Sequence, residues 1–274
     1  IGKVVIKVEP KLRDKWLNKT NNFMPHGTAV ITGGLGGLGL VTAEMLVDSG
    51  VRCVVLVSRS GRVKHSNQGL EERLKALQAI QTAKIVIEQC DMGVEEEVRA
   101  MLSRVRLSYG PVRMVVHAAG VLRDALIGNQ DADSMRAVFS PKADGAWYLH
   151  KHTQEDDLAA FVMFSSISAL VGNPGQVNYG SANAFLDELV RWRVRQGLVG
   201  VSVQWPGVRD VGMAAAMDKN VQLEDATLVD VDVVRNVLEL VFHSESLKSP
   251  VQSLLPMTLL QETLSPELKK WFHR

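Results

Sequence analysis

The sequence is poor in the features that mark several large classes of protein. Only two of its 274 residues are cysteines, Cys53 and Cys90, too few for a disulfide-stapled scaffold. Both lie in or beside apolar, strand-like runs, so we expect buried structural thiols and a reducing compartment. No apolar run reaches the roughly 18–20 residues that a membrane-spanning helix requires. No cluster of His, Cys and Asp has the spacing of a metal site.

A charge excess of one sign is also missing. The 31 basic and 30 acidic residues nearly cancel and leave a formal net charge of +1. No overall field would attract a nucleic acid or an anionic membrane, so we predict neither as a partner. The chain begins at Ile1 without a signal-peptide pattern. We expect part of a longer or processed protein in the cytoplasm, or in an organellar stroma if the parent is plastid-targeted.

Glycine, by contrast, is concentrated in one informative segment. Residues 28–39 read Thr-Ala-Val-Ile-Thr-Gly-Gly-Leu-Gly-Gly-Leu-Gly. A β-branched run enters the glycines and an amphipathic segment leaves them, which predicts strand, tight turn and helix. The spacing fits the G-x-G-x-x-G fingerprint, whose glycines let the backbone approach a pyrophosphate at a helix N-terminus. The nucleotide-binding residues predicted here are Thr32, Gly33, Gly34, Leu35, Gly36, Gly37, Leu38 and Gly39.

Strand and helix signals then alternate along the chain. The strand runs are apolar and β-branched, which is typical of a parallel sheet covered by helices on both faces. The predicted fold is α/β: a Rossmann-type, doubly wound parallel sheet of about seven strands. The predicted strands are 28–32, 53–58, 84–89, 113–118, 160–165, 200–205 and 250–255. The predicted helices are 37–49, 69–82, 94–108, 131–152, 181–196 and 231–242.

Two regions depart from this alternation. Residues 1–27 hold a strand-like piece and a polar stretch, interpreted as a leading strand and linker that remain from a preceding domain. Residues 208–230 carry small residues and mixed charges and predict a mobile lid over a pocket. The catalytic domain is predicted to span 28–257, and 258–274 to form a C-terminal helical tail that packs on the body.

The end of the second strand indicates which dinucleotide binds. NAD-binding folds usually carry an acidic residue there, which holds the ribose 2′-hydroxyl. Here the strand ends with Ser58, Arg59 and Ser60, a cation and two hydroxyls that suit a 2′-phosphate. We therefore predict NADPH rather than NADH. Asp91, after the third strand, is expected near the adenine, and Met92 beside it belongs to the same predicted site.

A set of polar residues follows the glycine loop. Ser166 ends an apolar strand, and Tyr179 begins a helix whose next turn carries Asn183. With Lys142 in the earlier segment 141–150, this set resembles the short-chain dehydrogenase/reductase family. Ordinary members carry a lysine where this chain has Asn183. The ketoreductase domains of modular polyketide synthases and animal-type fatty-acid synthases show the same exchange and take their lysine from an earlier helix. The runs 116–122 and 183–187 look like those domains too.

The resemblance implies reduction of a β-ketoacyl thioester by NADPH, with Tyr179 as proton donor and Ser166 as hydrogen-bond donor to the substrate oxygen. A free tyrosine has a pKa near ~10, and a nearby Lys142 cation is expected to lower it. Asn183 is expected to orient Lys142 or to hold a relay water, and Ser165 stays open as the important hydroxyl instead of Ser166. The further cofactor contacts implied are Ala118, Ala119, Gly120, Pro206 and Gly207.

Markers near the predicted pocket resemble the B-type group of polyketide ketoreductases, which implies a 3R β-hydroxyacyl product. That group carries Leu-Asp-Asp where this chain has Leu-Arg-Asp, so Arg123 is a departure. The A-type group carries a tryptophan where this chain has Val171. The usual Trp-Gly-x-Trp is replaced by Trp-Pro-Gly-Val at 205–208, which bears on the packing of the lid. The predicted substrate and stereochemistry residues are Leu122, Asp124, Pro174, Asn178 and Met213.

The same resemblance implies partners. The substrate hangs from the phosphopantetheine arm of an acyl carrier protein, so we expect that carrier and neighbouring synthase domains. Carrier proteins are acidic, and Arg123 and Arg209 could meet that surface or simply be solvated. Three alternatives stay open: a fatty-acid synthase β-ketoacyl reductase, a free-standing short-chain alcohol dehydrogenase, and a non-catalytic NADPH-binding scaffold domain.

The histidines carry no catalytic prediction. His117 follows a strand at the cofactor edge, where we expect a structural hydrogen bond rather than a general base. His150 and His152 lie on a predicted helix and are expected to face solvent.

Overall fold

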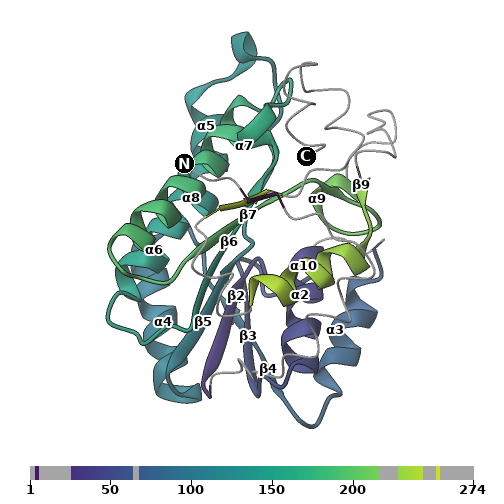
Figure 1. Ribbon diagram of the computed structural model, residues 1–274, viewed down its shortest axis with the longest axis vertical. Coiled ribbons are helices and arrows are strands. Elements are labelled where there is room, and N and C mark those ends of the chain that lie inside the picture. The colour runs from purple at the N-terminus through teal and green to yellow at the C-terminus, as the bar shows by residue number, and fades with distance from the viewer. Residues whose placement is uncertain (1–3, 6–25, 64–67, 216–227, 243–250, 254–274) are drawn as a thin grey trace.

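The computed structural model of this chain describes residues 4–5, 26–63, 68–215, 228–242 and 251–253. Within these ranges the chain forms a parallel β-sheet with helices packed on both faces (Figure 1). In the same ranges no helix is both long and apolar enough to cross a lipid bilayer. The predicted doubly wound α/β fold is confirmed.

The main sheet contains eight described strands. They are β1 (Val4–Val5), β2 (Thr28–Thr32), β3 (Cys53–Ser58), β4 (Lys84–Gln89), β5 (Val112–His117), β6 (Ala160–Ser166), β7 (Val201–Trp205) and β10 (Val251–Ser253). All pairs are parallel, in the order β1-β10-β7-β6-β5-β2-β3-β4. The chain runs outward from β2 in one direction and from β5 in the other, so the crevice between their ends is the topological switch point, where such sheets bind ligands.

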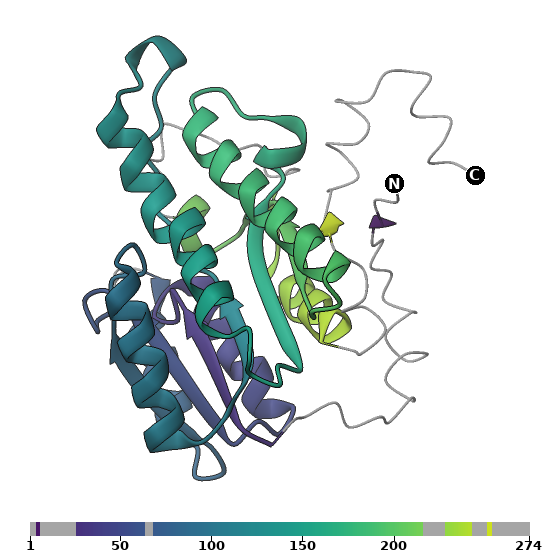
Figure 2. The ribbon, with the colours of Figure 1, turned by 90° about the vertical axis from the view of Figure 1, so that its left-hand side faces the viewer.

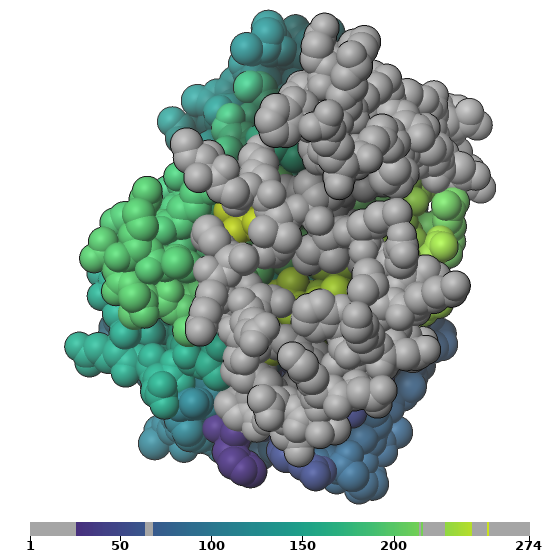
Figure 3. Space-filling model, viewed as in Figure 1, coloured from purple at the N-terminus to yellow at the C-terminus, as the bar shows by residue number. Residues whose placement is uncertain are grey.

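Helices cover the two faces of this sheet in separate layers. They are α2 (Gly37–Asp48), α3 (Leu70–Gln78), α4 (Glu95–Tyr109), α5 (Ala132–Phe139), α6 (Gly145–His152), α7 (Ser168–Val171), α8 (Val177–Arg195), α9 (Gly212–Ala215) and α10 (Val231–Val241). In Figure 1, α2, α3 and α10 lie on one side and α4, α6 and α8 on the other, with α5 and α7 above the sheet. Figure 2 looks onto the layer of α4, α6 and α8. Figure 3 shows the molecule from the same side as Figure 1, with the surface of α8 at its left-hand edge.

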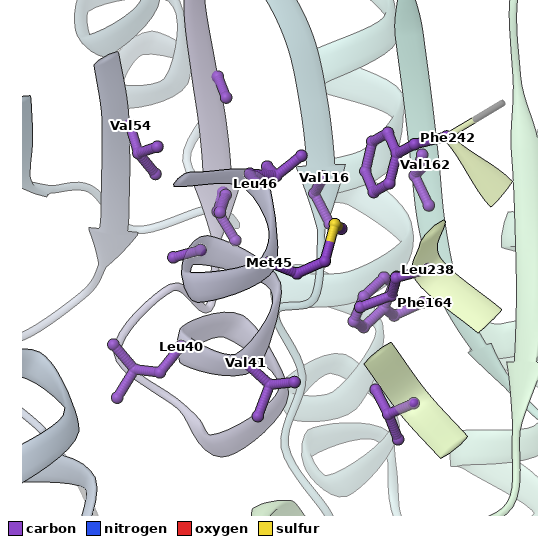
Figure 4. Packing of buried hydrophobic residues seen from close by; sticks show 14 of the residues in the cluster. Leu40, Val41, Met45, Leu46, Val54, Val116, Val162, Phe164, Leu238 and Phe242 are labelled. Carbon is purple, nitrogen blue, oxygen red and sulfur yellow. The ribbon is translucent and has the colours of Figure 1, made fainter. Parts of the chain in front are cut away.

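Two apolar clusters hold these layers to the sheet. Alternation along β2 sends Ala29 and Ile31 into the cluster beneath α2 and α10, and Val30 into the cluster beneath α4, α6 and α8. Figure 4 shows the first cluster, where Met45 of α2 and Leu238 of α10 converge on the side chains of β5 and β6. Each fully buried apolar side chain contributes about 1.5–3 kcal/mol to the free energy of unfolding. The clusters on the two faces of the sheet therefore hold in place the strand ends that form the site.

The predicted helix at 131–152 is interrupted. Between α5 and α6 the backbone widens into a π-helical turn, η3 (Ser140–Asp144). Pro141 has no backbone N–H and cannot make the α-helical hydrogen bond at this point, which favours the wider turn. The helix predicted at 181–196 instead begins at Val177, so α8 includes Tyr179 in its first turn.

The regions outside the alternation are described only in part. β1 pairs in parallel with β10, with Val4 beside Gln252, so this piece of the predicted leading strand belongs to the main sheet. In the predicted lid, β8 (Gly207–Val208) and β9 (Leu228–Val229) form a second, two-stranded sheet and α9 begins at Gly212. Most of 1–27, the middle of the predicted lid and the predicted tail at 258–274 lie outside the described residues.

Candidate active site

Three adjacent strands deliver polar side chains to one edge of the sheet. Thr32 ends β2, His117 ends β5 and Ser166 ends β6. Thr32 is paired with His117 across the ladder, and His117 with Met163 of β6. Because the carboxyl ends of parallel strands share an edge, the loops that follow these residues form the rim of the switch-point crevice.

The glycine loop after β2 has the shape of a phosphate cradle. Gly33 has a φ of +66°, and a Cβ there would lie 2.6 Å from the carbonyl oxygen of Ala118. A Cβ on Gly39 would lie 2.4 Å from the carbonyl oxygen of Gly33. Gly36, the residue before α2, has no side chain with which to cap that helix. The first N–H groups of α2 are therefore available to an anion, and the loop fits the pyrophosphate of a dinucleotide.

Beyond β3, the chain carries the residues predicted to read the ribose. The Ser58 hydroxyl accepts a hydrogen bond from the Gly61 N–H at 3.0 Å, which shapes this turn. Arg59 is exposed, and so is Arg62, which shares the turn and was not singled out from the sequence. The sequence signal that could have identified Arg62 is its position two residues after Ser60, in the same turn as Arg59. Both guanidinium groups suit a phosphate at this position.

The remaining predicted cofactor residues line neighbouring loops. Ala118 donates its N–H to the Thr32 carbonyl at 3.0 Å, which continues the β2–β5 pairing into the loop. A Cβ on Gly120 would lie 3.5 Å from Nζ of Lys142, so the loop after β5 runs directly past the lysine side chain. Asp91 accepts a hydrogen bond from the Gly93 N–H at 2.9 Å. Ala119, Met92 and Pro206 are buried, and Gly207 begins β8.

Lys142 and Tyr179 come together from separate elements. The turn η3 directs Lys142 inward, where its side chain is 2% exposed and Nζ donates to the carbonyl oxygen of Phe164 at 2.9 Å. Nζ lies 5.3 Å from the centre of the Tyr179 ring, within the range of a cation–π contact. The first turn of α8 supplies Tyr179, which is also buried.

Two further groups flank the phenol. Ser166 and the amide of Asn183 act as hydrogen-bonding neighbours that lower the pKa of Tyr179. Ser165 instead donates to the Asn183 carbonyl at 3.3 Å and is buried, so Ser166 is the hydroxyl that faces Tyr179. Asn183 Nδ2 donates to the Tyr179 carbonyl at 2.8 Å. Its Oδ1 is buried and has no hydrogen-bond partner in the described part of the chain, which suits a donor from a bound ligand or a water.

The electrostatics of this pair differ from the sequence-based expectation. Burial raises the pKa of Tyr179 to about 12 and outweighs the hydrogen bonds that lower it. The expectation that Lys142 would lower this pKa below its usual value is therefore wrong for the chain alone. Burial also lowers the pKa of Lys142 to about 7, against a smaller opposing effect from the carboxylate of Asp187. Each burial effect favours the neutral form of its group.

Asp187 is a buried carboxyl group that hydrogen-bonds to two side chains of β7. The carboxylate lies one turn of α8 beyond Asn183 and accepts from Ser202 at 2.6 Å and from Gln204 at 2.5 Å. It is 3% exposed. Burial raises the pKa of the Asp187 carboxyl and outweighs the hydrogen bonds that lower it, and the charged form of this group raises the pKa of Lys142.

The predicted stereochemistry residues form one connected wall. Asp124 accepts a hydrogen bond from Gln176 at 2.9 Å, and Asn178 donates to the carbonyl of Arg123 at 2.7 Å. Asn178 lies in the first turn of α8, where it also accepts from the N–H of its neighbour Tyr179 at 2.7 Å, so its bond to Arg123 ties this wall to the phenol-bearing helix. Leu122 and Met213 pack against the small apolar cluster of Val138, Tyr179 and Ala182. Val171, the last residue of α7, is exposed, and so is Pro174 in the loop that follows.

The histidines are divided between correct and wrong expectations. His117 is fully buried and makes the structural hydrogen bonds expected of it. His150 was expected to face solvent and is instead fully buried. Its ring contacts those of Trp147 and Trp192, and it is hydrogen-bonded to Arg193 at 2.7 Å. His152 is largely buried and pairs with Glu95. Of the cysteines, Cys90 is buried as expected, whereas Cys53 is partly exposed.

Comparisons with known proteins place this geometry among ketoreductases. The family model described as "KR domain" matches residues 27–210. A phenolphthiocerol synthesis polyketide synthase of Mycobacterium marinum is 42% identical over 206 residues, which cover 75% of this chain and 9% of that protein. Mellein synthase of Phaeosphaeria nodorum is 38% identical over 217 residues, which cover 76% and 12%. The chain thus spans about a tenth of the length of these curated relatives.

Solved structures agree with the sequence matches. A ketoreductase from the first module of phoslactomycin biosynthesis in a Streptomyces species has a TM-score of 0.76 at 30% identity, covering 88% of this chain and 56% of that chain. An A-type ketoreductase from a modular polyketide synthase has a TM-score of 0.74 at 28% identity, covering 88% and 51%. Levodione reductase shares the fold, with a TM-score of 0.72 at 17% identity, covering 86% and 98%.

Proposed function

Because this chain belongs to the ketoreductase family described by the KR domain, we propose that it reduces a β-ketoacyl thioester to a β-hydroxyacyl thioester with NADPH in polyketide biosynthesis. One observation carries the proposal. The ammonium of Lys142 lies 5.3 Å from the centre of the Tyr179 ring, and Ser166 is a hydrogen-bonding neighbour of that phenol. This pair lies at the edge of the sheet where the glycine loop begins, so a proton donor and a dinucleotide site adjoin each other.

The residues divide the work of carbonyl reduction. When bound in the glycine loop, NADPH would supply the hydride for the carbonyl carbon. Negative charge develops on the carbonyl oxygen, and the Ser166 hydroxyl donates a hydrogen bond to it. Tyr179 transfers its phenolic proton to the same oxygen. With a pKa of about 12, the phenol is fully protonated at neutral pH, yet it remains far more acidic than the alcohol that forms.

Lys142 acts on the phenolate that remains. Its Nζ is already in place beside the ring, so the attraction between the charged form of Lys142 and Tyr179 grows as Tyr179 loses its proton and is strongest after transfer. Asn183, whose Oδ1 faces no partner among the described residues, would hold the ribose of the dinucleotide or a water that returns a proton to Tyr179.

The choice of NADPH over NADH rests on the turn after β3. Arg59 and Arg62 are exposed there, and Ser58 and Ser60 add hydroxyls. A 2′-phosphate accepts bidentate hydrogen bonds from a guanidinium group, whereas a 2′-hydroxyl offers little to it. The expected discrimination is tested by comparing kcat/KM for the two cofactors.

The hydroxyl configuration is proposed as 3R. Asp124 and Asn178 are two of the B-type markers that this chain carries, with Leu122 and Pro174. Asp124 accepts a hydrogen bond from Gln176, and Asn178 donates to the backbone carbonyl of Arg123. Substitution of the Asp by Arg123 leaves these links intact because only the backbone carbonyl of that residue is used. Chiral chromatography of the reduced thioester gives the test: a 3S product would exclude the B-type assignment.

The proposed substrate carrier is an acyl carrier protein within a cytoplasmic synthase. Support comes from relatives such as the phenolphthiocerol synthesis polyketide synthase of Mycobacterium marinum, of which the matched part of this chain covers 9%. Arg123 is exposed next to Leu122 and Asp124, whereas Arg209 pairs with Asp230 at 2.9 Å. Charge reversal of Arg123 should weaken reduction of carrier-bound substrate more than that of a free thioester, and equal losses would exclude a docking role.

Absorbance of NADPH provides the decisive assay. We expect oxidation of NADPH on addition of a β-ketoacyl thioester, and a drop in turnover of about 10²–10⁴-fold in Tyr179→Phe. Binding of NADPH to this variant should be nearly unchanged, because phenylalanine keeps the ring beside Lys142. Full activity in Tyr179→Phe would show that the proton donor is another group. Oxidation of simple alcohols in preference to thioester reduction would favour a free-standing alcohol dehydrogenase, and NADPH binding without turnover a scaffold domain.

A further inference from the structure

His117 joins two parts of the site through its buried imidazole. Its Nδ1 lies 2.6 Å from the Thr32 hydroxyl, and its Nε2 lies 2.8 Å from the backbone carbonyl oxygen of Lys142. A carbonyl oxygen only accepts, so Nε2 carries the proton and donates it. Nδ1 is then the acceptor for the Thr32 hydroxyl. The two contacts together select one neutral tautomer of the ring.

The surroundings keep this imidazole neutral. The side chain is fully buried, and burial together with the charge of Lys142 lowers its pKa to about 3. Protonation would also turn Nδ1 into a second donor and place two cations next to each other. The donor to the Lys142 carbonyl therefore persists throughout the pH range in which a ketoreductase works.

The carbonyl that receives this bond lies in the π-helical turn. In η3 the Gly145 N–H reaches back to the carbonyl of Ser140, which is one residue further than in an α-helix. The turn also fits closely against its neighbours. A Cβ on Gly145 would lie 3.3 Å from His117 Cε1 and 3.0 Å from the carbonyl oxygen of Met92. The imidazole thus both contacts this rare turn and hydrogen-bonds to it.

We propose that His117 is a positioning residue for Lys142. Its neutral ring fixes the backbone of the π-helical turn to the end of β2, so the ammonium beside Tyr179 and the start of the glycine loop keep a constant separation. The role deepens the proposed function and rests on it, because the position of Lys142 matters only if that cation stabilises the phenolate. It differs from a general-base role, since both ring nitrogens are already engaged within the protein.

Two substitutions separate the hydrogen bonds from the space that the ring fills. His117→Phe retains most of the volume and removes both bonds, whereas His117→Gln keeps one donor and one acceptor. We expect His117→Phe to lower kcat by about 10²-fold and to change KM for the thioester by less than about 3-fold. His117→Gln should recover about 10-fold of that loss. His150→Gln, which alters another buried histidine, is the matched control and should leave kcat within about 2-fold.

A double-mutant cycle tests whether His117 acts through the lysine. In a Lys142→Met background, His117→Phe should cause less than about a 2-fold further loss of kcat, because the cation that it positions is gone. A role in overall folding would instead give losses that multiply. Multiplying losses, or a His117→Phe variant with wild-type kcat, would overturn the proposal.

A second measurement keeps this inference separate from the proposed function. If the wild type does not oxidise NADPH with the thioester, or if Lys142→Met is fully active, the proposed function fails on its own. Hydrogen exchange then decides the role of His117. His117→Phe should speed exchange of the amides in 140–146 by about 10-fold and leave those of α4 unchanged. Unaltered exchange in 140–146 would show that the imidazole does not hold the turn.

Discussion

Lys142 and Tyr179 meet with the ammonium 5.3 Å from the centre of the aromatic ring. Burial shifts the pKa of the two groups in opposite directions, to about 7 for Lys142 and about 12 for Tyr179. A buried phenol and a nearby cation attract each other only modestly, whereas a phenolate and the same cation attract strongly. The arrangement therefore favours the state after proton transfer over the state before it, which is the direction that carbonyl reduction requires.

The two neighbouring serines should differ in their effect on turnover. Ser166→Ala removes the hydroxyl beside Tyr179 and should lower kcat by about 10²-fold, as expected for loss of a donor to a developing oxyanion. Ser165→Ala removes only a 3.3 Å bond to the Asn183 carbonyl and should change kcat by less than about 3-fold. Steady-state kinetics of both variants decide between them. A larger loss in Ser165→Ala would assign the role to that hydroxyl.

Replacing the buried lysine should change how stability depends on pH. Lys142 has a pKa near 7 in the folded protein and an ordinary value of 10.5, so the unfolded chain binds more protons between these values. The unfolding free energy of the wild type should therefore rise with pH across this window, by up to about 1.4 kcal/mol per unit from this group. Lys142→Met should lack that contribution and gain most in relative stability below pH 7. Urea titrations of both proteins at pH 6 to 9.5 measure the difference, and parallel curves would contradict it.

Removing one guanidinium should alter cofactor preference. Arg59→Ala should raise the Kd for NADPH by about 10-fold or more, the effect of losing a charge-assisted hydrogen bond, and leave the Kd for NADH nearly unchanged. Arg99→Ala is the control, since Arg99 is an exposed arginine of α4 that pairs with Glu96. Fluorescence titration gives both constants. Equal weakening of the two cofactors would mean that Arg59 does not contact the 2′-phosphate.

A methyl group added in the glycine loop should damage the fold and the cradle together. Gly39→Ala places Cβ 2.4 Å from a backbone oxygen that cannot move aside easily. We expect a loss of about 1–3 kcal/mol in unfolding free energy and weak NADPH binding. Gly128→Ala is matched to it, because a Cβ there meets nothing within 4 Å, and should change stability by no more than about 0.5 kcal/mol. Denaturant melts and NADPH titrations of both variants provide the comparison.

Acid should destabilise the chain through its buried histidines. Burial lowers the pKa of His150 from 6.5 to about 4 and that of His117 to about 3. The unfolded chain then binds more protons as pH falls below 6.5, so stability decreases through this range. His150→Gln, which can still accept from Arg193, should lose stability less steeply between pH 6.5 and 4. Thermal melts at fixed pH values compare it with the wild type, and an unchanged slope would contradict the expectation.

Local signals were enough to predict the scaffold. The β-branched runs predicted the strands, and β2, β3 and β4 begin and end where expected. The glycines after β2 predicted the cradle because a tight turn and a close backbone approach are properties of the residues themselves. Ser166, Lys142 and Tyr179 were named from a resemblance. The structure brings Lys142 and Ser166 close to Tyr179, and their catalytic roles stay a prediction.

The missed features depend on burial and on contacts between distant segments. The pKa of Tyr179 was expected to fall and instead rises, because the low-dielectric surroundings outweigh the hydrogen bonds. His150 was expected in solvent, but Trp147 and Trp192 enclose it and Arg193 satisfies it. The second contact of His117, to the Lys142 carbonyl, depends on a π-helical turn that no periodicity in the sequence announces.

Because Lys142 lies in the π-helical turn η3, the position of its ammonium depends on the number of residues in that turn as well as on the identity of the side chain. A π-helical turn holds one residue more than an α-helical one, and one residue corresponds to about 100° of rotation about the helix axis. Deleting a single residue between Phe139 and Gly145 would let this turn close to an α-helical one, so the side chains of the segment would rotate relative to α6, whose Ala146 and Leu149 are fully buried. A lysine moved by such an indel could not be restored by any point substitution, so the spacing of this segment constrains the domain as tightly as its charged residue does.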